Sequence, residues 1–189
     1  MRASLETGFE LDRRRHWLRG EMVASKKPDL HKIARVLSEA QVPYAVIGGV
    51  ALQVHQEEPR TTLDVDIAVI DCDLLPRAAL AAIGFSETGR FAHSENWIGP
   101  GGTPVQFTDD SEFAAAIHAA QSVLVDDVNL MVVRAVDLLH AKIRAAGDAA
   151  CRASKRVQDL ADALSLIEKS PTLKEDLDAG EVALLGRVS

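Results

Sequence analysis

Apolar positions recur at two different spacings along the chain, and the change of spacing predicts alternating helices and strands. Over residues 29–41, after Pro28, apolar residues fall three or four apart, as on the buried face of a helix. The next run, VPYAVI (42–47), is continuously apolar and predicts a short buried strand. Gly48-Gly49 interrupts the run, and VALQVHQ (50–56) predicts a second helix.

The middle of the chain predicts a strand, a helix and a hairpin. TLDVDIAVI (62–70) alternates apolar and acidic residues, which is typical of a strand with one buried face. DLLPRAALAAIG (73–84) predicts a helix that ends at its glycine. RFAHSENWI (90–98) and TPVQFT (103–108), joined by GPGG, predict a hairpin.

The last third predicts one more buried strand, VNLMVV (128–133), and two helices over residues 135–146 and 152–168. For the last helix, the spacing predicts a buried apolar stripe with a charged side opposite. The stripe consists of Val157, Leu160, Leu164 and Ile167, and the charged side of Lys155, Asp159 and Asp162. The whole pattern predicts the α+β class: a small mixed β-sheet flanked by helices, with a helical C-terminal part.

The 189 residues fit one domain with a small appendage. Residues 1–27 are charged and poorly periodic, so we expect them to form an N-terminal arm. Residues 28–130 carry the strands and helices of the expected core. Residues 131–189 add a strand and helices that we expect to pack on this core.

Composition narrows the class of protein. With 47% apolar and 26% charged residues, the chain has the composition of a soluble globular protein. No apolar run approaches the ~20 residues of a membrane span, and the N-terminus lacks the apolar segment of a secretory signal, so we expect a cytoplasmic protein. The two cysteines, Cys72 and Cys151, have no Cys or His nearby at metal-ligand spacing, and we expect reduced thiols.

The net charge argues against one class of function, and the distribution of charge identifies one basic region. A net charge of -7 argues against a general nucleic-acid coat protein, because non-specific affinity comes mostly from Lys and Arg that meet phosphates. Residues 131–156 nevertheless hold six basic side chains and two acidic ones. This is the clearly positive region of the chain.

Asp64 and Asp66 stand two residues apart in the predicted strand 62–70. Alternate side chains of a strand point to the same face, which brings the two carboxylates within ~7 Å of each other. At ~5 Å and an effective dielectric constant near 20, they repel by roughly 3 kcal/mol. A divalent cation such as Mg²⁺ would relieve the repulsion. The alternative is a solvent-facing strand whose charges are simply hydrated.

Two further features flank this acid pair. Gly48-Gly49 lies between a strand and a helix, where small residues let a phosphate approach the backbone N–H groups of the helix N-terminus. By itself, such a pair is more often a structural turn. Arg60 either binds a phosphate through two parallel hydrogen bonds or pairs with Glu57 or Glu58.

The order of glycine pair, helix, arginine and Asp-x-Asp strand resembles the nucleotidyltransferase superfamily, in particular its abortive-infection toxin and minimal nucleotidyltransferase branch. The resemblance implies a nucleotidyltransferase-like palm. It matches Gly48 and Gly49 to the nucleotide-phosphate loop, Asp64 and Asp66 to the metal-binding catalytic acids, and Arg60 and Thr62 to the Arg-x-Thr before those acids.

A weaker resemblance extends over residues 29–168. Lys142 stands at the recurrent lysine of the family's C-terminal helix. SKRVQDLADAL (154–164) resembles the following Lys-Asp-x-x-Asp helix, with Gln158 where lysine is usual and Asp159 and Asp162 at the acids. As an alternative without a catalytic role, Lys142 and Asp162 form an ion pair between helices.

One position departs from the family pattern. Active members usually carry a third carboxylate on a later strand, where it holds metal or takes the proton of the attacking hydroxyl. If Val105 and Phe107 face the core, Gln106 occupies this position, and glutamine cannot act as a base. An acid from the following loop substitutes only if a bulge or register shift turns it inward. The candidates are Asp109, Asp110 and Glu112.

The resemblance therefore implies a Mg²⁺-dependent (or Mn²⁺-dependent) enzyme that moves a nucleoside monophosphate from ATP or another nucleoside triphosphate to an acceptor hydroxyl. Arg60, Lys142 and Lys155 would stabilise phosphate charge. The acceptor is left open among an RNA end, a protein and a small molecule. For a toxin, the resemblance also implies an antitoxin partner. The alternative is a catalytically lapsed member that binds nucleotide or a protein partner.

Overall fold

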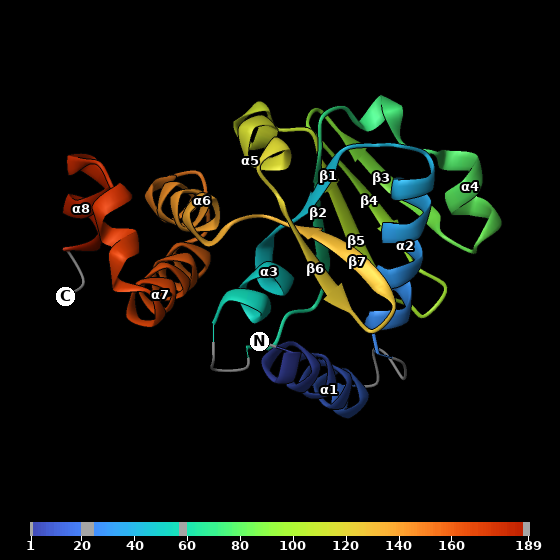
Figure 1. Cartoon of the computed structure of the whole chain (residues 1–189), viewed down its shortest axis with the longest axis horizontal. Helices are drawn as coiled ribbons and strands as arrows, with labels where there is room; N and C mark the ends of the chain where they lie inside the picture. Colours follow the sequence, from blue (N-terminus) through green and yellow to red (C-terminus); the bar gives the residue numbers. More distant parts are fainter. Residues whose placement is uncertain (1, 20–24, 57–59, 187–189) are drawn as a thin grey trace.

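The computed structural model describes residues 2–19, 25–56 and 60–186 (Figure 1). Within this part of the chain, seven strands form one mixed sheet in the order β3-β4-β5-β2-β1-β7-β6. Helices flank the sheet, which confirms the α+β class. The strands are β1 (Tyr44–Val46), β2 (Val65–Val69), β3 (Ser86–Phe91), β4 (Ser94–Ile98), β5 (Pro104–Thr108), β6 (Gln121–Val125) and β7 (Val128–Val132).

The helices lie in two groups. In Figure 1, α2 lies on one side of the sheet, while α6, α7 and α8 are gathered at the opposite end of the molecule. Between them, α3 packs on β2 and also touches α1, α6 and α7. The helices are α1 (Arg2–Arg19), α2 (Lys27–Glu39), α3 (Gly48–His55), α4 (Arg77–Ala82), α5 (Ala114–His118), α6 (Ala135–Gly147), α7 (Ala153–Lys169) and α8 (Ala179–Leu185), with 3-10 turns at Cys72–Leu74, Ser111–Phe113 and Pro171–Asp176.

The alternation of apolar residues along the central strands determines which side chains face the core. β2 runs antiparallel to β1 and parallel to β5, with Asp66 beside Gln106 in register. Val65, Ile67 and Phe107 are fully buried, so the residues between them on each strand face the other side. This alternation sets Asp66 and Gln106 on the same face of adjacent strands.

The strongly periodic segments are confirmed. The helices predicted over 29–41, 135–146 and 152–168 agree with α2, α6 and α7 to within two residues at each end. The helix predicted over 73–84 is shorter, because the chain makes a 3-10 turn before Pro76 and α4 begins after this proline.

Neither edge strand of the sheet follows from the sequence pattern. The strand predicted over 90–98 is wrong as a single element, because the chain turns between β3 and β4 at residues 92–93. β6, at the other edge, was not predicted. Most side chains of β3 and β6 are exposed, so neither strand shows the apolar alternation that a half-buried strand requires.

The orientation predicted for α7 is wrong in part. Val157 is 66% exposed and does not belong to the buried stripe, whereas Asp159 and Asp162 are buried. The reason is that Lys142 on α6 faces these two carboxylates and makes their burial possible.

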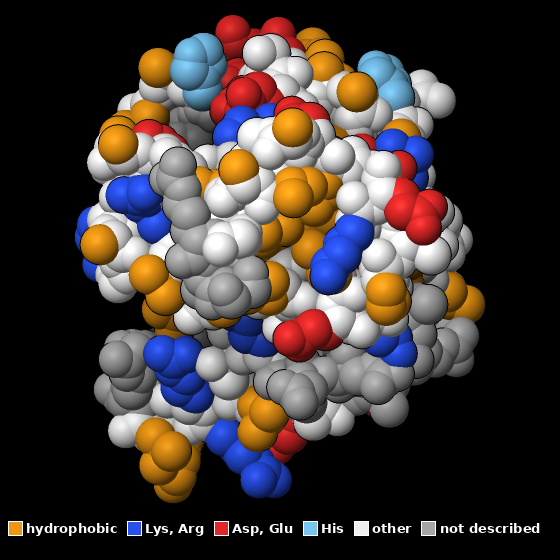
Figure 2. Space-filling view, turned by 90° about the vertical axis from the view of Figure 1, so that its left-hand side faces the viewer, with side chains coloured by type: hydrophobic (Ala, Val, Ile, Leu, Met, Phe, Trp, Pro, Cys, Tyr) orange, Lys and Arg blue, Asp and Glu red, His pale blue; other side chains and the backbone are white. Residues whose placement is uncertain are grey.

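Figure 2 shows the end of the molecule with the C-terminal helices, where hydrophobic side chains gather near the middle of the face.

The part of residues 1–27 that the structure describes includes an 18-residue helix, α1. Leu5 and Phe9 of α1 are buried, and α1 packs on α3. A Cβ on Gly8 would lie 2.6 Å from side-chain atoms of Gln53, so this glycine permits the close approach of the two helices. The boundary expected between residues 130 and 131 falls inside β7, which pairs with β1 and β6.

The GPGG turn between β4 and β5 is tied to the first turn of α2. The buried Asp29 carboxylate accepts a hydrogen bond from the Gly101 N–H at 3.0 Å. A Cβ on Gly99 would lie 2.4 Å from the same carboxylate, so the turn needs glycine there.

None of the described helices is long and apolar enough to cross a membrane.

We expect Asp29→Ala to lower the free energy of unfolding by about 1–3 kcal/mol, because it leaves the partly buried Gly101 N–H without this acceptor. Urea denaturation followed by circular dichroism measures the change. Glu39→Ala, an exposed substitution on the same helix, is the control and should change stability by less than about 0.5 kcal/mol. Equal effects of the two substitutions would contradict the assigned role.

Candidate active site

A cleft of about 840 Å³ opens where α1, the start of α3, the loop before β2, the sheet and the C-terminal helices meet. All nine residues that the sequence analysis named for metal, nucleotide or the third acid line this one space. They are Gly48, Gly49, Arg60, Thr62, Asp64, Asp66, Gln106, Lys142 and Lys155.

The glycine pair lies directly against the acids. Gly48 has φ +59°, in the left-handed region that favours glycine, and a Cβ there would lie 1.9 Å from Asp66 Oδ2. A Cβ on Gly49 would lie 2.5 Å from Thr62 Cβ. The pair is thus required as a structural turn. It also leaves the first turn of α3 free of side chains at the edge of the cleft.

Asp66 and Asp64 occupy different local structures. Asp66 lies on β2, whereas Asp64 immediately precedes the strand and accepts a hydrogen bond from Thr62 Oγ1 at 3.0 Å. Within the described part of the chain, the Asp66 carboxylate has no hydrogen-bond donor or cation bound to it. Burial, together with the charge of Asp64, raises the pKa of Asp66 to about 6.

This arrangement of oxygens fits a hard divalent cation. Two neighbouring carboxylates, one of them without a partner, present oxygen ligands and an uncompensated negative charge, which is the donor set that Mg²⁺ or Mn²⁺ prefers. The described residues nevertheless hold no group of three His, Cys, Asp or Glu side chains arranged around one ion. Any ion bound here would therefore take its remaining ligands from substrate or water.

Gln106 stands at the place of a third acid. It lies beside Asp66 in the parallel pairing of β2 with β5, and Asn96 of β4 lies on its other side. The next two residues from Asp66 along this row of the sheet, on β5 and β4, are therefore amides. They donate and accept hydrogen bonds but do not take a proton at neutral pH.

The alternative acids are engaged elsewhere. Asp109 accepts a hydrogen bond from the Cys72 N–H, Asp110 caps the 3-10 turn that follows β5, and Glu112 pairs with Arg144 at 2.7 Å. None of the three lines the cleft. No bulge or register shift interrupts the pairing of β5 with its neighbours, so nothing turns these residues inward.

A buried ionic network forms the basic wall of the cleft. Lys142 Nζ lies 2.7 Å from Asp159 Oδ1 and 2.9 Å from Asp162 Oδ2. Lys155 Nζ reaches the same oxygen of Asp159 at 2.8 Å, and Arg60 reaches Asp162 Oδ2 at 3.0 Å. Burial raises the pKa of Asp159, but the two lysines more than offset this effect, so the pKa is lowered overall. Three cations thus share two carboxylates.

The network bears on the alternative roles expected for Lys142 and Arg60. Lys142 forms the pair between helices and also lines the cleft, so the two descriptions are compatible. Arg60 pairs with Asp162, not with a neighbour in sequence that the structure describes. Glu57 and Glu58, its alternative partners, lie outside the described residues.

The sequence analysis missed two cations of the cleft, Arg15 on α1 and Arg152 at the start of α7. Arg15 lies in the segment expected to be an arm. The available signal was the spacing of Leu5, Phe9 and Asp12, three buried residues at helical intervals. Among the described residues, neither arginine pairs with a carboxylate.

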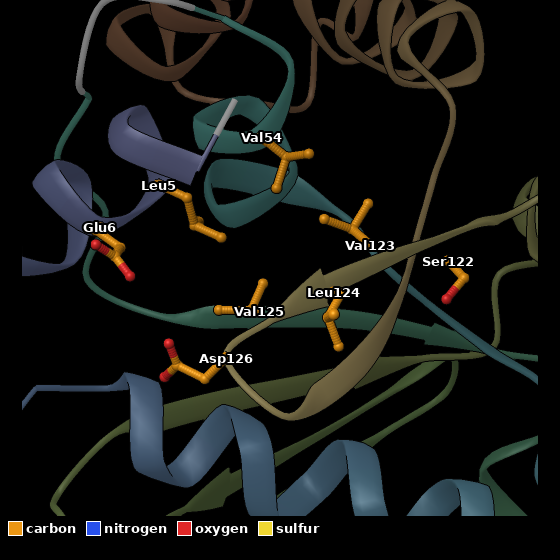
Figure 3. Close-up of a pocket in the computed structure, with 8 residues that line it drawn as sticks. All are labelled: Leu5, Glu6, Val54, Ser122, Val123, Leu124, Val125 and Asp126. Atoms are coloured by element: carbon orange, nitrogen blue, oxygen red, sulfur yellow. The ribbon is translucent and has the colours of Figure 1, made fainter.

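A second hollow, of about 330 Å³, has a different character. Figure 3 shows Leu5 of α1, Val54 of α3, and Val123 and Val125 of β6 around it. The acids at its rim, Glu6 and Asp126, share Lys27 at 3.6 and 2.7 Å. The described residues that line this hollow include no glycine pair and no Lys or Arg side chain. The larger cleft is therefore the candidate active site.

Neither cysteine belongs to the cleft. Both are free thiols, Cys72 buried and Cys151 partly exposed. Burial and the neighbouring Asp109 raise the pKa of Cys72 to about 12. A thiol with this pKa stays protonated at neutral pH and does not act as a nucleophile.

The fold has known counterparts. No family model and no curated protein sequence matches the chain. Among solved structures, an antigenic nucleotidyltransferase-like protein from Paracoccidioides brasiliensis is similar at 20% identity, with a TM-score of 0.58 over 85% of this chain and 87% of that one. The antibiotic-resistance factor ANT(2'')-Ia in solution follows at 14% identity and TM-score 0.57, covering 86% and 97%. ANT(2'')-Ia in complex with adenylyl-2''-tobramycin is 15% identical, with TM-score 0.55 and coverage of 86% and 98%. The chain therefore has the fold of the nucleotidyltransferase superfamily.

Proposed function

We propose that this protein is a divalent-metal-dependent nucleotidyltransferase, which moves a nucleoside monophosphate from a nucleoside triphosphate to an acceptor hydroxyl and releases pyrophosphate. The observation that carries the proposal is the convergence of the acid pair, the glycine pair and the basic wall on one cleft. The fold supports the same reaction class.

Each part of the cleft has a role in this reaction. Asp64 and Asp66 hold a Mg²⁺ or Mn²⁺ ion, which neutralises charge on the phosphate oxygens. Gly48 and Gly49 let phosphates approach the backbone N–H groups at the start of α3. Lys155 is half exposed and directs its ammonium toward the charge that develops on the transferred group.

Lys142, Arg60 and Lys155 are all bound to buried carboxylates, but Lys142 and Arg60 are less exposed than Lys155. Lys142 donates a hydrogen bond to Asp159 and forms an ion pair with Asp162, so among the described residues it keeps N–H donors for a phosphate oxygen. Arg60 forms an ion pair with Asp162 through Nη1. The carboxylates hold the cations in place before substrate binds, which lowers the cost of ordering them.

The positive charge of the cleft limits the kinds of acceptor that we expect to bind there. Among the described residues, five Lys and Arg side chains line the cleft against two acids, and Arg15 and Arg152 lack a carboxylate partner. Tobramycin, the acceptor part of the adduct bound by ANT(2'')-Ia, carries several amines. A polycation of this kind is repelled by the positive wall, so we propose a neutral or anionic acceptor such as an RNA end. If the protein acts as a toxin, an acidic antitoxin segment fits the same wall.

The direct test measures pyrophosphate release from each nucleoside triphosphate with Mg²⁺ or Mn²⁺, in the presence of total RNA, a protein extract or tobramycin. Release with RNA or protein and none with tobramycin supports the proposal. Binding of Mg²⁺ and nucleotide without release for any acceptor supports the second candidate function. Absence of nucleotide binding would contradict the enzyme and the nucleotide-binding form of the second candidate.

The second candidate is a catalytically lapsed member that binds nucleotide or a protein partner. Gln106 favours it, because the residue beside Asp66 cannot take the proton of the acceptor hydroxyl.

We expect Gln106→Glu to raise pyrophosphate release about tenfold or more, since it adds a carboxylate in register with Asp66. Asn96→Asp, one strand further away, is the matched control and should have a smaller effect. An enzyme that works without a third acid would instead show no gain, or a loss, with Gln106→Glu.

A further inference from the structure

Helix α1 supplies a buried acid to the loop that carries Asp64. Asp12 of α1 is 1% exposed. Its Oδ1 accepts a hydrogen bond from the Thr62 N–H at 2.7 Å, and its Oδ2 accepts one from Gln53 Nε2 at 3.1 Å. An acid on the N-terminal helix thus binds the backbone 50 residues further along the chain.

Lys26, directly before α2, completes this contact. Its side chain is fully buried, and its Nζ lies 3.0 Å from Asp12 Oδ2. The same Nζ donates to the Thr62 carbonyl at 2.7 Å and lies 3.5 Å from the Asp64 carbonyl. Asp12 and Lys26 together therefore hold both the N–H and the C=O of Thr62.

The loop needs such support because it lacks regular secondary structure. Residues 60–64 lie outside any helix or strand, and Thr62 is the residue whose hydroxyl donates to Asp64. A buried ion pair adds little to stability on balance, because desolvation of both charges offsets their attraction. Its better-attested use is to fix one arrangement of the chain, and here that arrangement includes Asp64.

Arg15 follows Asp12 by three residues, on the neighbouring turn of α1. Its Nη1 donates to Thr61 Oγ1 at 2.7 Å, and its side chain lines the cleft. A guanidinium has five N–H donors, and among the described residues this hydrogen bond uses only one of them. Among the described residues no carboxylate neutralises it.

We propose that α1 contributes two functions to the cleft. The buried Asp12–Lys26 pair positions the loop of residues 61–64, and Arg15 binds an anionic group of the substrate. The proposal rests on the nucleotidyltransferase function proposed above for the role of Arg15. The positioning role of the pair rests on contacts that need no substrate.

Binding of Mg²⁺ with inorganic tripolyphosphate, measured by calorimetry on the full chain, tests Arg15. We expect Arg15→Ala to weaken binding about tenfold and Arg15→Lys to restore part of the loss. Arg14→Ala is the matched control, since Arg14 is its neighbour, is 70% exposed and pairs only with Glu10 among the described residues. Equal affinities for Arg15→Ala and Arg14→Ala would overturn the assignment.

Hydrogen exchange without any ligand tests the positioning pair. We expect Lys26→Met and Asp12→Ala to speed amide exchange in residues 61–65 about tenfold or more, and to weaken binding of Mn²⁺ alone. Asp12→Asn keeps an oxygen for the Thr62 N–H and should have a smaller effect, which keeps the test informative if Asp12→Ala does not fold. Ile33→Ala, a buried substitution on α2, controls for general loss of stability.

The outcomes separate this inference from the proposed function. Unchanged exchange in the loop of folded Lys26→Met protein overturns the positioning role, even if the wild-type protein transfers nucleotides. Faster exchange in a protein that binds neither Mn²⁺ nor tripolyphosphate supports the positioning role and contradicts both the proposed function and the role of Arg15.

Discussion

Replacement of Asp66 by asparagine is expected to lower pyrophosphate release by about a hundredfold or more, because it removes one of the two carboxylates that we propose bind the metal. Asp64→Asn should have a similar effect. Binding of Mn²⁺ alone, followed by electron paramagnetic resonance, should weaken in both variants. Asp176→Asn changes an exposed aspartate that does not line the cleft and is the control.

The same substitution should stabilise the metal-free protein. The pKa of Asp66 is about 6 in the folded protein and the ordinary value is 3.8, so only the folded state keeps the proton between these pH values. Stability is therefore lost as the pH rises from about 4 to 6, and the full cost is present above pH 6. Asp66→Asn removes this cost and should raise the Tm at pH 7.5. A lower Tm with unchanged activity would argue for a structural aspartate.

Lys142→Met is expected to lower the free energy of unfolding by about 3–5 kcal/mol, the largest stability effect that we expect in the chain. Lys142 is 6% exposed and lies between Asp159 and Asp162. Its removal leaves these two buried carboxylates with only Lys155 and Arg60 as cationic partners. Urea denaturation measures the loss.

Two comparisons isolate the charge effect from the packing effect. Lys155→Met removes a cation from the same Asp159 oxygen, but this lysine is half exposed, and we expect a loss of no more than about 1 kcal/mol. Adding Asp159→Asn to Lys142→Met should recover part of the stability, because one of the stranded charges is gone. A double variant that is less stable than Lys142→Met would contradict the assigned network.

The sequence predicts an element well where one of its faces is buried and the other is not. α2 and α6 follow this rule, whereas β2 is buried along most of both faces and is recognisable by its apolar and acidic alternation only around Asp66. β3 and β6 lie at the edges of the sheet and show no such contrast, so their positions depend on pairing with a neighbouring strand. Local patterns do not record that pairing.

Buried charges account for most of what the sequence could not show of the site. Periodicity assigns charged residues to the solvent, yet Asp12, Lys26, Asp159 and Asp162 are all buried. Each is compensated by a partner at least 14 residues away or on another element, as Asp12 is by Lys26. By contrast, the acids and glycines between residues 46 and 70 lie on adjoining elements, and their approach follows from the strand-helix-strand order alone.

The in-register position of Gln106 beside Asp66 has a consequence for the history of this protein. Glutamine and glutamate codons differ only in their first base. A single base substitution therefore separates an amide from a carboxylate at the strand position next to Asp66, which we propose binds the metal. One mutational step thus connects the Gln106 form of this cleft with a form that carries a third carboxylate.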